Sequence, residues 1–65
     1  HSEVADLLER LPEEYRVPLM LYYFEECKVE EVAEALQLGV SAVKMRLKRG
    51  RELLKKALEG ENGHD

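Results

Sequence analysis

The sequence contains a single cysteine in 65 residues, and this scarcity limits how the chain can be held together. Cys27 alone excludes an intrachain disulfide and any zinc site built from four cysteines. A chain of this length forms one small domain, which buries only about 60% of the surface that its unfolded form exposes. We therefore expect a single domain that folds by apolar packing in the reducing cytoplasm.

Long apolar runs and catalytic groupings are also missing. The longest apolar run covers residues 17–24, eight residues including Pro18, whereas about 20 are needed to cross a bilayer. No nucleophile–base pair, metal-ligand spacing or phosphate-binding loop is present in the sequence, and a domain this small has no room for a large active site. We expect no membrane contact, no enzymatic activity, no metal and no cofactor.

What the chain does have is an uneven distribution of charge. Residues 1–38 hold ten acids and three bases, a charge of −7, whereas residues 39–65 hold seven bases and four acids, a charge of +3. All seven of these bases lie between Lys44 and Lys56, with Glu52 as the one acid among them. A local basic surface sets the local field even when the whole molecule is acidic. The basic block predicts an anionic partner, and we favour nucleic acid over a plain solvated helix face.

Hydrophobic spacing predicts four helices. Apolar residues at i, i+3, i+4 and i+7 indicate a short first helix capped by Ser2 and a third helix over about 29–36. Pro12 is suited to open a second helix over about 12–26, which contains Pro18. The fourth helix is expected to run from about residue 40 to 58, with Gly60 as its C-terminal cap.

The apolar run at 17–24 could also form a buried strand. However, no second strand-like segment exists to pair with it, and an isolated strand would leave its backbone groups without partners. We therefore interpret the run as part of a mostly buried helix. The aromatic residues in and around it are expected to lie in the core, with one left exposed for a protein partner; they are Tyr15, Tyr22, Tyr23 and Phe24.

The fourth helix divides into two sides when its residues are placed 100° apart. The side predicted to face the core comprises Val43, Leu47, Gly50 and Leu54. The outward side comprises Ser41, Lys44, Met45, Lys48, Glu52 and Lys55, with Arg49 and Lys56 at its edge. Arg46 and Arg51 lie nearer the core side, and we expect them to pair with acids of the first half of the chain.

A short helix, a three-residue turn at 37–39 and a longer basic helix form a helix-turn-helix, whose second helix enters the DNA major groove. Three segments make the pattern more specific: residues 11–16 (LPEEYR), 30–36 (EEVAEAL) and 43–51 (VKMRLKRGR). In this order and spacing they closely resemble region four of bacterial sigma factors of the extracytoplasmic-function (ECF) group. The resemblance covers about residues 11–56.

The helical pattern and the resemblance together predict an all-α domain of four short helices over residues 1–60, with the helix-turn-helix at about 29–56. The polar residues 61–65 are expected to form a flexible tail. The resemblance also implies a function in transcription initiation. The last helix would read the minus-35 element of promoter DNA, and the apolar surface of the earlier helices would dock on the β-subunit flap of RNA polymerase. An anti-sigma factor is a further expected partner.

Candidate DNA-binding residues follow from the resemblance and from the outward side of the helix. The family's contacts fall on Lys44, Met45, Lys48 and Arg49, and Ser41 completes the set. Arginine reads guanine with two hydrogen bonds, so Arg49 is the candidate for a base edge, while Lys44 and Lys48 are candidates for phosphate or guanine. Met45 either touches a thymine methyl group or is a plain exposed methionine.

The chain departs from the family's usual residues at several positions. Lys28 stands where a Ser or Thr caps the third helix, and Gln37 stands where Gly is favoured in the turn. Two alternative functions stay open. One is a protein-interaction module that binds polymerase flap or an anti-sigma factor, and the other is the DNA-binding domain of a response regulator, which shares the helix-turn-helix.

Overall fold

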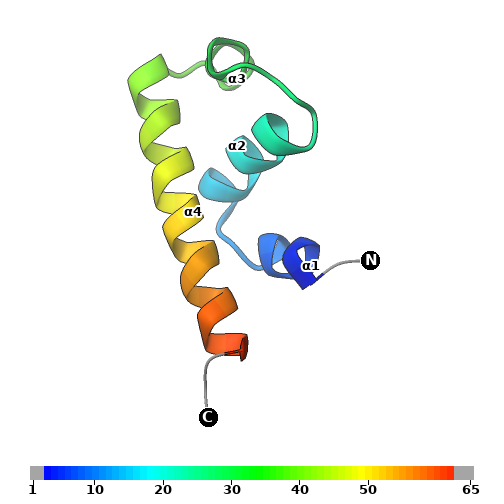
Figure 1. The fold of residues 1–65 in the computed structure, drawn as a ribbon. Coiled ribbons are helices and arrows are strands. Elements are labelled where there is room, and N and C mark those ends of the chain that lie inside the picture. The colour runs from blue at the N-terminus through cyan, green and yellow to red at the C-terminus, as the bar shows by residue number, and fades with distance from the viewer. Residues whose placement is uncertain (1–2, 63–65) are drawn as a thin grey trace.

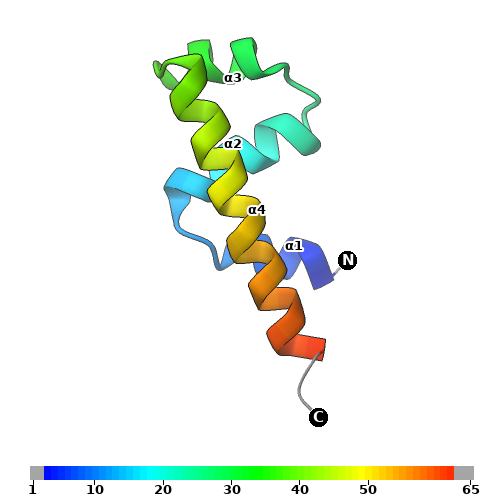
Figure 2. The ribbon, with the colours of Figure 1, turned by 60° about the vertical axis from the view of Figure 1, so that its left-hand side comes forward.

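The computed structural model describes the backbone of residues 3–62 and the side chains of residues 3–60. Residues 3–62 form four helices, α1 (Glu3–Glu9), α2 (Glu13–Tyr23), α3 (Val29–Leu36) and α4 (Val40–Asn62). Helix α4 runs along the length of the molecule, and the other three helices lie along one side of it (Figures 1 and 2). Helix α3 lies at the start of α4, α2 crosses its middle and α1 lies toward its end. The predicted all-α fold with four helices is confirmed.

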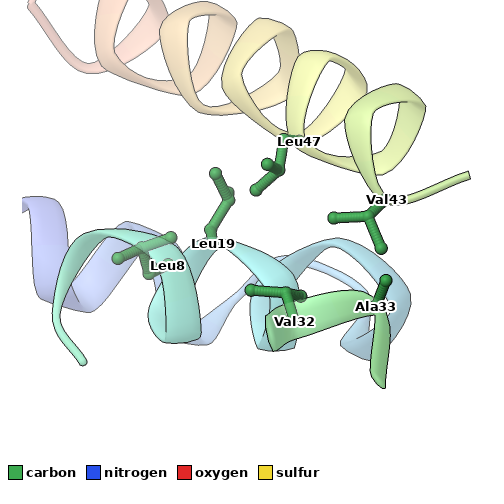
Figure 3. Packing of buried hydrophobic residues seen from close by; sticks show 6 residues of the cluster. All are labelled: Leu8, Leu19, Val32, Ala33, Val43 and Leu47. Atoms are coloured by element: carbon green, nitrogen blue, oxygen red, sulfur yellow. The ribbon is translucent and has the colours of Figure 1, made fainter. Parts of the chain in front are cut away.

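A small apolar core joins all four helices (Figure 3). Its buried side chains are Leu8 from α1, Leu19 from α2, Val32 and Ala33 from α3, and Val43 and Leu47 from α4. The predicted inner stripe of α4 is confirmed, because Val43 and Leu47 are 0% and 3% exposed. Gly50 is also buried, and Leu54 packs against the core from its edge.

Two predicted helix ends are wrong. Helix α2 stops at Tyr23 rather than residue 26, because the chain reverses at Glu26, whose φ of 58° is left-handed and incompatible with a continuing helix. Helix α4 continues to Asn62, so Gly60 lies inside it and is not a cap. A single glycine costs a helix only about 1 kcal/mol and does not end it by itself. The predicted cap Ser2 and residues 63–65 of the predicted tail lie outside the described residues.

The early end of α2 also changes the prediction for the aromatic residues. Tyr15 and Tyr22 are partly buried, but Tyr23 and Phe24 are 50% and 57% exposed. Two aromatic side chains, not one, therefore remain open to solvent. They stand where the helix stops and the chain turns toward α3, so no further turn of α2 covers them.

The crossing of α2 and α4 depends on Gly50. A Cβ atom at this position would lie 2.8 Å from Cδ1 of Leu19 and 3.3 Å from Cβ of Tyr15. Both neighbours belong to α2, and Leu19 is itself only 2% exposed, so it has little room to move. The missing side chain lets the two helices approach closely at the centre of the fold.

We predict that Gly50→Ala lowers the free energy of unfolding by about 1 kcal/mol. Overpacking costs ~1–3 kcal/mol, and the better helix propensity of alanine offsets about 1 kcal/mol of that. Urea denaturation measures the change. Gly60→Ala is the matched control, because a Cβ there meets nothing within 4 Å, and this variant should be no less stable than the parent chain. Equal stabilisation by both substitutions would show that Gly50 is not required for close packing.

Candidate nucleic-acid interface

The helix-turn-helix is formed by α3, the turn at 37–39 and α4. Gln37 ends α3 in the left-handed conformation, with φ 57° and ψ 46°. The Leu38 backbone N–H then donates to the Ala33 carbonyl at 2.9 Å, which gives a hydrogen-bond partner to a free carbonyl in the last turn of α3. The Val43 N–H donates to the Gly39 carbonyl at 3.1 Å, in the first turn of α4. Ala33 and Val43 meet in the core across this turn. The turn and the core contact together determine the orientation of α4 relative to α3.

The start of α3 is capped from one side only. Lys28 occupies the cap position in an extended conformation, and a lysine side chain has no acceptor for the free N–H groups of the first turn. In the other direction, the Lys28 backbone N–H donates to Oε1 of Glu31 at 2.7 Å. Half of a capping box is therefore present, without the Ser or Thr side chain that would complete it.

All five candidate residues are exposed on α4. We call this set, Ser41, Lys44, Met45, Lys48 and Arg49, the basic face. Met45 is its apolar member and is 67% exposed. The buried residues Val43 and Leu47 alternate with the basic face along the helix, so the face points away from the core. Whether these side chains contact DNA stays a prediction.

The basic face borders two shallow depressions that bring in residues from elsewhere in the sequence. Met45 and Arg49 share one of them with Glu14 and Tyr15 of α2. Lys44 lines the other beside Lys28 from the loop before α3. These neighbours could not be predicted from the sequence, because they depend on how α2 and the loop pack against α4.

The two arginines nearer the core side have different surroundings. The Arg51 guanidinium donates a long hydrogen bond of 3.4 Å to the Tyr23 hydroxyl. The partner found for Arg51 is thus a tyrosine, where an acid was expected. Arg46 is half-buried in a depression that Glu13 and Glu14 also line, so acids of the first half of the chain do lie near it. An ion pair of Arg46 stays a prediction.

A second surface, further along α4 than the basic face, is apolar. It is a groove of about 420 Å³ between α1, the end of α2 and the second half of α4. We call it the apolar groove; it is lined by Val4, Leu8, Leu19, Tyr23, Phe24, Arg51, Leu54, Lys55 and Leu58. Its side chains include exposed large apolar groups, Val4, Tyr23 and Phe24, which a soluble surface seldom gathers in one place without a partner.

Between residues 3 and 62, no three His, Cys, Asp or Glu side chains are placed to hold a metal ion. Across the same residues, no helix is both long enough and apolar enough to span a membrane. Cys27 is a partly buried free thiol in the loop before α3.

Comparison with known proteins gives a consistent result. Residues 1–54 match the model of the family described as Sigma-70, region 4. The chain is 43% identical over 57 residues to the ECF RNA polymerase sigma factor SigW of Bacillus subtilis. The aligned segment covers 88% of this chain and 30% of SigW. The chain is 40% identical over 57 residues to the RNA polymerase sigma factor SigZ of the same organism, covering 88% of this chain and 32% of SigZ.

A third relative is the RNA polymerase sigma-H factor of Pseudomonas aeruginosa, which is 38% identical over 58 residues, 89% of this chain and 30% of the relative. The chain therefore spans about a third of the length of the curated relatives it matches. No solved structure gives a significant match.

The strained turn of the helix-turn-helix gives a prediction. A non-glycine residue in the left-handed conformation costs ~1–2 kcal/mol, so Gln37→Gly should raise the free energy of unfolding by about 1 kcal/mol after the greater entropy loss of glycine is allowed for. Gln37→Ala keeps the Cβ atom and should give no such gain. Thermal and urea unfolding of the two variants measure the difference, and a stabilising alanine would contradict the explanation by backbone strain.

Proposed function

The chain belongs to the Sigma-70 region 4 family, and on this premise we propose that it recognises the minus-35 element of promoter DNA for an RNA polymerase sigma factor. The observation that carries the proposal is the basic face, five exposed residues on one side of the second helix of a helix-turn-helix. The names of the relatives support it, since they are sigma factors of RNA polymerase.

Affinity and specificity would come from different residues of the basic face. Lysine and arginine neutralise phosphates and release counterions, which gives affinity without sequence preference. Base edges in the major groove give the specificity. We propose that Arg49 reads guanine through O6 and N7, since it is exposed and its planar fork of donors matches these two acceptors. Lys44 and Lys48 would set the position of the helix on the phosphates.

The acidic first half of the chain supports this orientation. It carries ten acids and three bases, whereas the bases from Lys44 onward lie on α4. Duplex DNA would be repelled by the surfaces of α1, α2 and α3 and attracted to the exposed cations of α4. Opposite charges on different faces would therefore favour one way of docking, although the net charge of the chain is −4.

The test is a titration of DNA binding against salt. The probe is a duplex selected by this chain from a random library, with the chain tethered to polymerase if its own affinity is too low. With about four to six phosphates neutralised, the slope of log K against log salt should be roughly −4 to −5. Lys48→Ala should reduce that slope by about 1, because one phosphate contact is lost. Binding that does not depend on salt would exclude the proposal.

Arg49 is expected to behave differently from a lysine that meets phosphate. Arg49→Ala should weaken binding by about 1–3 kcal/mol and relax the preference at one base pair. Lys56→Ala is the matched control, an exposed cation two turns beyond Lys48 on the same helix; it should leave the base preference unchanged. Selection from the random library with each variant compares the preferences. An unchanged preference in Arg49→Ala would assign base reading to another residue.

We also propose that the apolar groove docks the β-subunit flap of RNA polymerase. The groove has an apolar floor and two exposed cations, Arg51 and Lys55, which suits an apolar helix that carries acids along its edge. None of the groove residues belongs to the basic face, so polymerase and DNA could bind together. An anti-sigma factor that occupied the groove would compete with polymerase.

Phe24 provides the test of the groove. It is 57% exposed, so Phe24→Ala should leave folding intact while it weakens binding to polymerase core by at least tenfold, as expected for an aromatic hot spot. Met20→Ala is the control, since Met20 lies on α2 four residues before Phe24, is 40% exposed and does not line the groove. DNA binding should not change in either variant. If Phe24→Ala binds polymerase normally, the flap docks elsewhere.

A further inference from the structure

Met45 is a large apolar side chain in an unexpected place. It is 67% exposed, more than any other exposed large hydrophobic residue in the described part of the chain. Val4, Tyr23 and Phe24, which are also exposed, gather in the apolar groove, but Met45 does not line it. Instead it lies on the basic face, with Lys44 beside it in sequence and Arg49 one turn further along α4.

The surroundings of Met45 restrict what could cover it. The depression next to it is lined by Glu14, Tyr15, Arg46 and Arg49, three of which are charged. They are one carboxylate, Glu14, and two guanidiniums, so the depression carries a net positive charge that a purely apolar partner would remove from water at a cost in free energy. A partner that offers anionic groups to the exposed cations and, within the same few ångströms, one small apolar group to the methionine fits this surface best.

The major groove of duplex DNA offers both. Phosphates line its edges, and the 5-methyl group of thymine is the apolar group among the hydrogen-bonding base edges that it displays. Methionine is flexible and polarisable, which suits contact with an isolated methyl group. Phosphates alone would not need an apolar side chain at this position.

We propose that Met45 is a specificity-determining residue that contacts the 5-methyl group of a thymine in the recognised site. This inference rests on the proposed function of α4 as the recognition helix, and it adds the chemical group that the helix reads. Met45 and Arg49 are four residues apart, which places their Cβ atoms about 5–6 Å apart on one side of the helix. Base pairs are about 3.4 Å apart, so the thymine should lie one or two base pairs from the guanine read by Arg49.

The experiment removes the thymine 5-methyl group and the Met45 side chain, first separately and then together. A duplex selected by this chain is made with each thymine replaced in turn by 2′-deoxyuridine, which lacks only the methyl group. At one position the uracil should weaken binding of the parent chain about three- to fivefold, the effect of one buried methyl group. Met45→Ala should bind the thymine and uracil duplexes equally.

Two further variants make the result specific. Met45→Leu keeps an apolar side chain and should retain part of the response to uracil. Met20→Ala removes another exposed methionine, from α2, and should respond to uracil as the parent chain does. The salt slope should be the same for Met45→Ala and the parent chain, because Met45 meets no phosphate.

The outcomes separate this inference from the proposed function. The inference is overturned if no uracil replacement weakens DNA binding by the parent chain. It is also overturned if uracil weakens DNA binding by Met45→Ala as much as binding by the parent chain, because Met45 would then read no methyl group. The parent chain would still show a steep salt slope and a selected sequence, so DNA recognition by α4 would stand. If the parent chain selects no duplex in either form of the assay, the proposed function and the inference both fail.

Discussion

The packing of one narrow stripe of α4 against the other three helices is the constraint on which the rest of the structure depends. Val43 and Leu47 are 0% and 3% exposed, so α4 cannot turn about its own axis without pulling them out of the core. Because successive residues of a helix are 100° apart, the burial of these two determines which others are exposed. The direction of Lys44, Met45 and Lys48 is thus a consequence of apolar packing.

A single helix serves two surfaces that have no residue in common. The first half of α4 carries the basic face, and its second half forms one wall of the apolar groove through Leu54, Lys55 and Leu58. Gly50 lies between the two surfaces, where α2 comes so close that an added Cβ atom would lie 2.8 Å from Cδ1 of Leu19. A partner in the groove would therefore act on α4 beyond this crossing and leave the basic face free for DNA.

The parts of the fold that follow from periodicity could be predicted from the sequence. The bounds of α3 and the buried stripe of α4 were correct because they depend on repeating apolar positions. The end of α2 was missed because the reversal is made by Glu26, a residue type that does not signal a left-handed conformation. The neighbours of the basic face, Glu14 and Lys28, could not be predicted, since they come from distant segments brought together by packing.

The proposed function and the further inference both require that DNA contacts this chain on the basic face of α4. The most direct test of this requirement is a nuclear magnetic resonance titration of the isotope-labelled chain with a duplex that it has selected. The largest chemical-shift changes are expected at residues 41–49, and the changes at residues of the apolar groove should be small. Changes concentrated in the groove, with residues 41–49 unaffected, would contradict DNA binding by the basic face.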